Sequence, residues 1–185
     1  MDMISTANPE LELVADFVNT NDIEGRRDHL GTPEQLSEWL AERGVAPAGS
    51  RVSPELHRRA IAVREGIRAL GRANNGEPPR AEQLEAMNRA AAAYPVRIGL
   101  TDGEWSLAPM GSGVDAFLAR VMAAVARAMA DDTWSRVKSC RNDRCRWLFI
   151  DHSRNHSATW CSMRVCGSRS KARAYRARRR EAAEA

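Results

Sequence analysis

The stretch that decides the fold of the C-terminal part is Cys140-Arg-Asn-Asp-Arg-Cys145, followed after fifteen residues by Cys161-Ser-Met-Arg-Val-Cys166. One short excursion separates the two cysteine pairs, so all four thiolates can converge on a single ion. Tetrahedral Zn²⁺ accepts a four-sulfur set and brings no redox chemistry. Because four thiolates leave no position for a water, the spacing predicts one structural zinc ion that is not catalytic.

Other interpretations of the four cysteines stay open. An iron–sulfur cluster also takes four cysteine ligands, and disulfides are a further alternative that a reducing cytoplasm disfavours. His152 and His156 lie between the pairs at i, i+4 spacing and can replace a cysteine, although surface or phosphate contact is the simpler expectation. Zinc binding supplies folding free energy on the order of 10–16 kcal/mol in finger peptides, which suits a segment too small to bury a core.

The cysteines lie in a strongly basic C-terminal segment. Residues 136–185 hold 14 Lys and Arg against 4 Asp and Glu, whereas residues 1–135 hold 14 against 20, so the net charges are +10 and −6. Such a division points to a polyanionic partner, most often nucleic acid. We therefore predict two domains, an acidic body over residues 1–133 and a zinc finger over residues 134–185.

The end of the chain, residues 168–184, has the composition of a basic helix. Four arginines fall on one face of it, with further cations beside them, and they form the predicted nucleic-acid contacts together with one arginine of the second cysteine pair: Arg164, Arg169, Lys171, Arg173, Arg176, Arg178, Arg179 and Arg180. Like charges weaken an isolated helix, and phosphates would remove that repulsion with release of counterions. A frayed, solvated tail is the alternative.

Aromatic residues accompany the cysteines. Trp147-Leu148-Phe149-Ile150 predicts a short apolar strand that pairs with residues 134–139, and Trp160 precedes the second cysteine pair. We expect these aromatic side chains to pack around the metal, with base stacking as the alternative.

The body is predicted to be mostly helical. Helical spacing and capping signals predict helices over Glu10–Asn19, from Thr32-Pro33 to Gly44, from Ser53-Pro54 to Asn75-Gly76, over Ala81–Ala93, and from Ser112 along a stripe that ends at Met129. Thr32 and Gln35 predict a capping box, and Thr101-Asp-Gly-Glu104 predicts a hairpin between residues 96–100 and 105–108. The fold class is mainly α (α+β), a helical domain with a small hairpin followed by the finger, itself a short hairpin and a basic helix.

The body contains no phosphate loop, nucleophile elbow or acid–base pair, so we do not expect an enzyme. Asn19, Thr20 and Arg64 are the candidate ligand pocket. Arg64 stands beside an apolar stripe and can reach into a cleft to hold an anion, whereas pairing with a helix neighbour is the alternative. Helix termination is the simpler explanation of Asn19-Thr20.

The chain resembles two known families. The four cysteines with Trp147-Leu148-Phe149, Ser153-Arg154-Asn155, Trp160-Cys161-Ser162-Met163 and Cys166-Gly167-Ser168-Arg169 resemble the CGNR zinc finger family. The segment from Leu13 to Thr20, together with Leu30-Gly-Thr-Pro and Trp39-Leu40, is similar to the ABATE domain that precedes this finger. The resemblance implies a bacterial regulator whose N-terminal domain senses a small ligand and whose finger binds DNA.

Two positions depart from the family pattern. Ser168 stands where the name-giving motif has Asn, which keeps a capping oxygen but removes an amide that can contact a base. Arg146 follows Cys145 where Gly is usual, and Gly supports a tight turn around a metal, so we expect strain in the first knuckle.

The expected partners are DNA, a small-molecule effector and a second copy of the chain in a homodimer. No apolar run is long enough to span a bilayer and no signal peptide is visible, so the expected location is cytoplasmic. The competing functions are an RNA- or ribosome-associated zinc module and a protein-interaction module that binds no nucleic acid.

Overall fold

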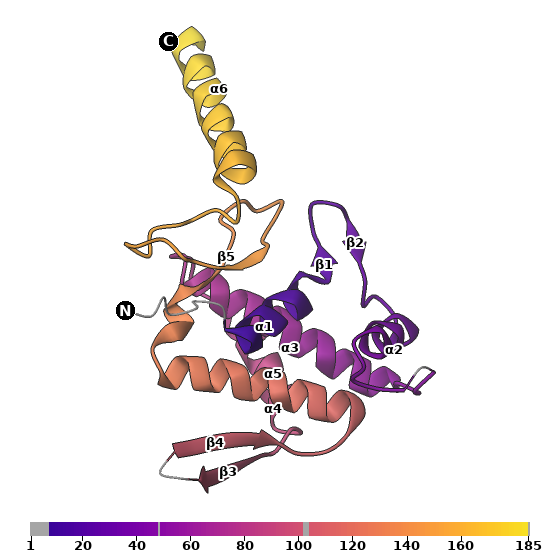
Figure 1. The fold of residues 1–185 in the computed structure, drawn as a ribbon. Helices are drawn as coiled ribbons and strands as arrows, with labels where there is room; N and C mark the ends of the chain where they lie inside the picture. The colour runs from indigo at the N-terminus through magenta and orange to yellow at the C-terminus, as the bar shows by residue number, and fades with distance from the viewer. Residues whose placement is uncertain (1–7, 48, 102–103, 185) are drawn as a thin grey trace.

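The computed structural model describes residues 8–47, 49–101 and 104–184, and its elements follow the chain as Figure 1 labels them. The helices are α1 (Pro9–Asn19), α2 (Pro33–Glu42), α3 (Pro54–Ala73), α4 (Ala81–Ala91), α5 (Gly113–Ala130) and α6 (Ser168–Glu184). Three antiparallel pairs complete the fold: β1 (Asn21–Asp22) with β2 (Arg27–Asp28), β3 (Val96–Thr101) with β4 (Glu104–Pro109), and β5 (Val137–Ser139) with β6 (Leu148–Ile150). The mainly α class is confirmed. No helix in these ranges is long and apolar enough to cross a membrane.

The helices of the body begin where the sequence predicts. The side chain of Asn8 accepts hydrogen bonds from the first turn of α1, and Ser53 does the same for α3. Thr32 and Gln35 form the complete capping box at the start of α2. These caps satisfy amide groups that have no partner within a helix, so the helix starts can be read from local chemistry.

An aromatic cluster joins three helices at the centre of the body. Phe17 of α1, Trp39 of α2 and Phe117 of α5 are buried, with ring centroids 5.3 Å apart for Phe17 and Phe117 and 5.5 Å for Trp39 and Phe117. Both pairs meet edge to face, the favoured geometry for aromatic rings. Met129, expected to continue the buried stripe of α5, is instead 42% exposed, because it lies in the last turn beyond this core.

The central helix α3 contacts both the body and the zinc finger. A Cβ at Gly71 would lie 2.4 Å from Cδ1 of Leu148 and 3.2 Å from the backbone nitrogen of Ser139. Glycine therefore lets the C-terminal half of α3 approach the β5–β6 hairpin closely. Val137 and Leu148, although they belong to the predicted finger, are part of the same hydrophobic core as α1 and α5.

The two hairpins outside the finger differ in how well the sequence predicts them. The β3–β4 hairpin lies where it is predicted, with Ile98 opposite Leu107, and its outer residues Ile98 and Leu100 are 72% and 77% exposed. The two-residue strands β1 and β2 are not predicted. The predicted strand over residues 134–139 is shorter than expected, because Thr133–Arg136 form a 3-10 turn before β5.

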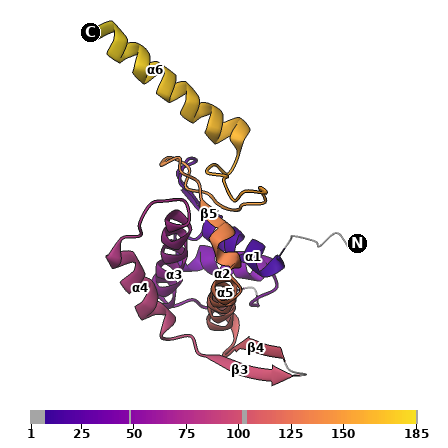
Figure 2. The same ribbon diagram turned by 90° about the vertical axis from the view of Figure 1, so that its left-hand side faces the viewer.

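Helix α6 extends away from the rest of the molecule. In two views at right angles it leaves the finger as a straight rod with no other element beside its distal half (Figure 1, Figure 2). Its 17 residues correspond to a rod about 25 Å long. The fold therefore presents its most basic element where a large partner can reach it.

Candidate metal centre and basic helix

The four cysteines of the two pairs come together in the fold. Their Sγ atoms all lie within 4.8 Å of one another, with 3.6 Å between Cys145 and Cys161 and 3.8 Å between Cys161 and Cys166. A tetrahedral zinc ion with Zn–S bonds of 2.3 Å requires sulfur atoms about 3.8 Å apart. Two of the measured separations match this value, and shifts of about 1 Å or less bring all four sulfurs around one Zn²⁺. Within the described ranges this is the only such group of metal ligands, and neither His152 nor His156 belongs to it.

The thiols influence one another's protonation. Hydrogen bonds from Cys145 and Cys161 lower the pKa of Cys140, whereas donation to Cys140 raises the pKa of both donors. Deprotonation of all four thiols would place four negative charges side by side, and a bound cation neutralises them. The donor set and its spacing define a site for one structural zinc ion, whose binding releases the remaining protons.

A small apolar cluster surrounds the sulfurs. Phe149 and Trp160 pack against the buried cysteines, as the sequence predicts. Trp147 does not, because its side chain points outward and is 40% exposed. The strand alternates, so Trp147 and Leu148 necessarily face opposite sides, and Leu148 takes the buried one.

The first knuckle turns sharply at Arg146. Its φ of 52° lies in the left-handed region that glycine adopts without cost, which confirms the expected strain. Its carbonyl accepts hydrogen bonds from Arg68 Nη1 at 2.8 Å and from Ser139 Oγ at 3.0 Å. Tertiary contacts with α3 and β5 therefore hold the turn in this conformation.

Asn142 connects the metal ligands to the basic helix. Its Nδ2 donates to Sγ of Cys166 at 3.6 Å, and its Oδ1 accepts from Arg173 of α6 at 3.1 Å. Its carbonyl also accepts from the backbone nitrogens of Cys145 and Arg146. Asn142 is not among the predicted site residues, although an Asn two positions after a ligand cysteine is well placed to turn the chain.

The second cysteine pair runs directly into α6. Met163–Gly167 form a π-helical turn that continues into Ser168 without a break, so Cys166 lies inside the helical segment. The capping residue is Ser162, whose Oγ accepts from the nitrogen of Val165 at 3.2 Å. Ser168 keeps the oxygen that can cap a helix but does not cap this one, because the helical segment starts five residues before it.

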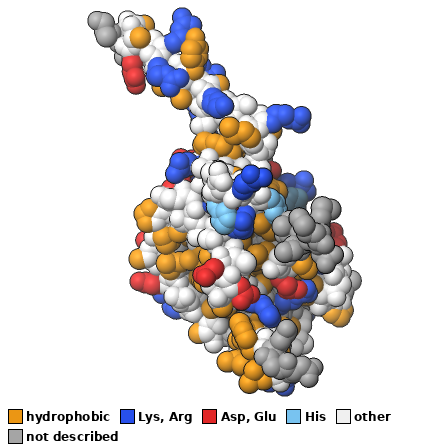
Figure 3. Space-filling model, turned by 60° about the vertical axis from the view of Figure 1, so that its left-hand side comes forward, with side chains coloured by type: hydrophobic (Ala, Val, Ile, Leu, Met, Phe, Trp, Pro, Cys, Tyr) orange, Lys and Arg blue, Asp and Glu red, His pale blue; other side chains and the backbone are white. Residues whose placement is uncertain are grey.

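The predicted nucleic-acid residues of α6 are exposed on the projecting rod, where blue side chains stand out in Figure 3. Two of them are held at its base. Arg169 pairs with Glu24 in the β1–β2 turn, and Arg173 bonds Asn142. The other five cations of α6 form no ion pair with any described residue: Lys171, Arg176, Arg178, Arg179 and Arg180. Arg164 is exposed on the π-helical turn.

A buried ion pair organises the loop between the cysteine pairs. Lys138 Nζ donates to Oδ2 of Asp151 at 2.7 Å and also to the carbonyls of His156 and Ala158. Burial of Asp151 opposes its ionisation, yet the hydrogen bonds from Lys138 and Ser153 hold its pKa well below the usual range. This ion pair is not among the sequence predictions. A lysine in the middle of a short, otherwise uncharged strand could have indicated a buried charge that needs an acidic partner.

The three candidate ligand-pocket residues are brought close together, but their polar groups have protein partners. Arg64 is 1% exposed and forms a bidentate pair with Asp28, both bonds at 2.7 Å, with Thr20 Oγ1 at 3.3 Å from the same guanidinium. Asn19 Nδ2 donates to the carbonyl of Leu148. The ion pair with Asp28 accounts for the burial of Arg64. The binding of an anionic ligand by Arg64 stays a prediction.

A four-cysteine metal site from which a basic helix projects, beside a helical domain, is the arrangement of a zinc finger joined to a second, helical domain. The ABATE family, described as "Putative stress-induced transcription regulator", matches residues 11–134, and the CGNR zinc finger family matches residues 136–179. The chain therefore belongs to the ABATE family and carries a C-terminal CGNR zinc finger. Comparison with curated proteins gave no match.

Proposed function

We propose that this protein is a zinc-dependent, DNA-binding transcriptional regulator. The metal fixes the start of α6, and the arginines of α6 contact phosphates while one or two reach base edges in the major groove. The observation that carries the proposal is the projecting helix α6. It begins directly after the π-helical turn Met163–Gly167, which contains the ligand Cys166. Its cations beyond Arg173 are exposed and have no ion-pair partner in the described part of the chain.

Charge and shape both support nucleic acid as the partner. A helix about 25 Å long that stands clear of its own domain has the dimensions to lie in a major groove. Phosphates would offset the repulsion among its arginines, and each neutralised phosphate releases counterions. The link from Cys166 through Asn142 to Arg173 makes the direction of the helix depend on the metal site.

The test is binding of the zinc-loaded chain to duplex DNA selected from a random pool, followed by fluorescence anisotropy between roughly 50 and 200 mM salt. We expect Arg176→Gln and Arg180→Gln each to weaken binding and to reduce the slope of log K against log salt by about 1. Arg89→Gln, which removes an exposed arginine of α4, is the matched control and should change neither. Equal effects of the three variants would contradict the proposal.

The same series separates the competing functions. A regulator keeps sequence-selective duplex binding when salt screens the non-specific contacts. An RNA-associated module would instead prefer structured RNA at every salt concentration. A protein-interaction module would bind neither nucleic acid even at low salt.

The proposal includes a small-molecule effector sensed by the body and a homodimer. The exposed Ile98 and Leu100 of β3 are apolar surface available to a second copy. Sedimentation of the full chain measures its mass directly, and a monomer at all concentrations would contradict the dimer.

A further inference from the structure

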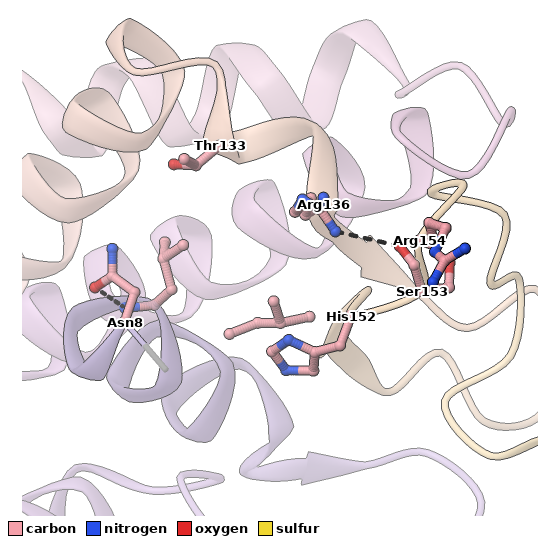
Figure 4. A pocket seen from close by; sticks show the side chains of 8 residues that line it. Asn8, Thr133, Arg136, His152, Ser153 and Arg154 are labelled. Atoms are coloured by element: carbon pink, nitrogen blue, oxygen red, sulfur yellow. Dashed lines mark hydrogen bonds between the residues drawn. The ribbon is translucent and has the colours of Figure 1, made fainter. Parts of the chain in front are cut away.

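A pocket of about 320 Å³ lies where the body meets the finger, on α1, the 3-10 turn and the loop after β6. Figure 4 shows Asn8 at the start of α1 on one side and Ser153 and Arg154 of the finger on the other, with Arg136 and His152 between them. The pocket is distinct from the metal site and shares no residue with the predicted pocket at Asn19, Thr20 and Arg64.

The polar lining is basic. Arg136, His152 and Arg154 contribute cationic or proton-donating groups, and none of the described residues that line the pocket is acidic. Arg136 is fixed in place, because its Nη1 donates to the carbonyl of Asp151 at 2.9 Å and reaches that of Ser153 at 3.4 Å. The hydrogen bonds that the Arg136 guanidinium forms with described residues use Nη1 alone, so its Nε and Nη2 are available to an occupant. Such a lining favours an anion.

The apolar lining sets the second requirement for the occupant. Leu11 is part of the buried core, and Ile150 packs against that core while also facing the pocket. The volume is near the lower end of the range for small-molecule sites, which combine apolar walls with a few polar groups. An inorganic anion would leave the apolar side without a contact.

We infer that this junction pocket binds a small organic carboxylate with a short apolar or aromatic group. The carboxylate faces Arg136 and Arg154, and the apolar group contacts Leu11 and Ile150. The inference rests on the proposed function only in treating the occupant as the effector, since the binding itself needs no nucleic acid.

The pocket lies next to residues that are linked to the metal site of the finger. Ile150 ends β6, and Asp151 next to it is held by Lys138 of β5, two residues before the ligand Cys140. An occupant contacts α1 and this loop at the same time. The occupant therefore bridges α1 of the body and the loop after β6 of the finger, two segments that are far apart in the sequence.

The probe for the test is benzoate, with benzamide as its uncharged analogue, titrated into the ¹⁵N-labelled, zinc-loaded full chain without nucleic acid. We expect saturable amide shifts at residues 150–154 and at the start of α1 with benzoate, and at least fivefold weaker binding of benzamide. Absence of saturation, shifts centred on α6, or equal binding of both probes would overturn the inference.

Variants provide the matched comparison. Arg154 is exposed and forms no hydrogen bond with a described side chain, so Arg154→Gln should fold and retain zinc while weakening benzoate binding at least fivefold. Arg144→Gln removes another exposed arginine of the finger that does not line the pocket, and it should leave the benzoate affinity unchanged. Equal effects of the two substitutions would overturn the inference. A chain that binds benzoate but no DNA would contradict only the proposed function.

Discussion

The side-chain amide of Asn19 exchanges two hydrogen bonds with the backbone of Leu148, which lies 129 positions later in the chain. Nδ2 donates to the carbonyl of Leu148 at 2.9 Å, and Oδ1 accepts from its nitrogen at 2.7 Å. The amide thus takes the place of a further strand beside β6. Through this pair, the last residue of α1 holds the finger hairpin against the body.

Replacing Asn19 by Ala should destabilise the whole chain. The substitution leaves the nitrogen and carbonyl of Leu148 without partners in a largely buried position, at a cost of about 1–3 kcal/mol each when no water replaces them. Urea unfolding of the zinc-loaded protein measures the change. Asn88→Ala on the exposed face of α4 is the control, and a loss no greater than in that variant would show that the pair contributes nothing.

Removal of zinc should loosen only part of the finger. Asn74 donates to the carbonyls of Trp134 and Val137, and Asn75 to those of Ser139 and Thr159, so α3 holds β5 independently of the metal. With a chelator, we expect amides of residues 161–184 to lose protection from hydrogen exchange while those of β5 and β6 keep most of theirs.

Cys166→Ser should reproduce the effect of the chelator, because it removes one of the four ligands. A matched Ser170→Ala variant, which alters α6 but leaves the sulfurs in place, should keep the protection pattern of the zinc-loaded chain. Complete loss of protection in β5 and β6 would mean that the hairpin depends on the metal, contrary to this prediction.

The sequence predicts those features that depend on local chemistry. The capping signals place the starts of α2 and α3, and the spacing of the cysteines identifies the metal site. The contacts that join body and finger are not predictable in this way. In the sequence, Asn19 and Asn75 are sufficiently explained as residues that end a helix, and only the fold brings β5 and β6 beside them.

Buried charges are the other group that the sequence does not place. Arg64 and Lys138 each lie in an apolar neighbourhood, and only the fold supplies Asp28 and Asp151 as their partners. The same limit applies to Trp147, whose alternation with Leu148 is visible in the sequence, whereas the side of the strand that becomes buried is decided by the approach of α3 at Gly71.

Replacing Arg146 by Gly should stabilise the first knuckle. Relief of the left-handed conformation is worth about 1 kcal/mol. The substitution also removes the ion pair with Asp143, which contributes less than that because the Asp143 carboxylate is exposed. The melting temperature of the zinc-loaded chain should therefore rise. Arg144→Gly, at a neighbouring position without a positive φ, should lower it, and equal shifts in the two variants would contradict the strain at Arg146.

The Asp28–Arg64 pair should make stability fall in acid. Burial raises the pKa of Asp28, but the hydrogen bonds from Arg64 and from the nitrogen of Leu30 outweigh it, so its pKa is lower in the folded chain than in the unfolded one. The stabilisation is therefore complete above the unfolded pKa of about 3.9 and is lost as the pH falls through the folded value.

Asp28→Asn isolates this contribution. At pH 7 we expect a loss of about 3 kcal/mol, the lower end of the cost of breaking a buried pair, because Asp28 is itself partly exposed while Arg64 is not. The difference from the unsubstituted chain should narrow as the pH falls below about 3.9 and through the folded pKa of Asp28, since the unsubstituted chain then loses the same charge. Asp16→Asn, at an exposed position of α1, should show neither effect in unfolding measured across this range. A difference for Asp28→Asn that stays constant with pH would mean that the pair stabilises the fold through packing and not through charge.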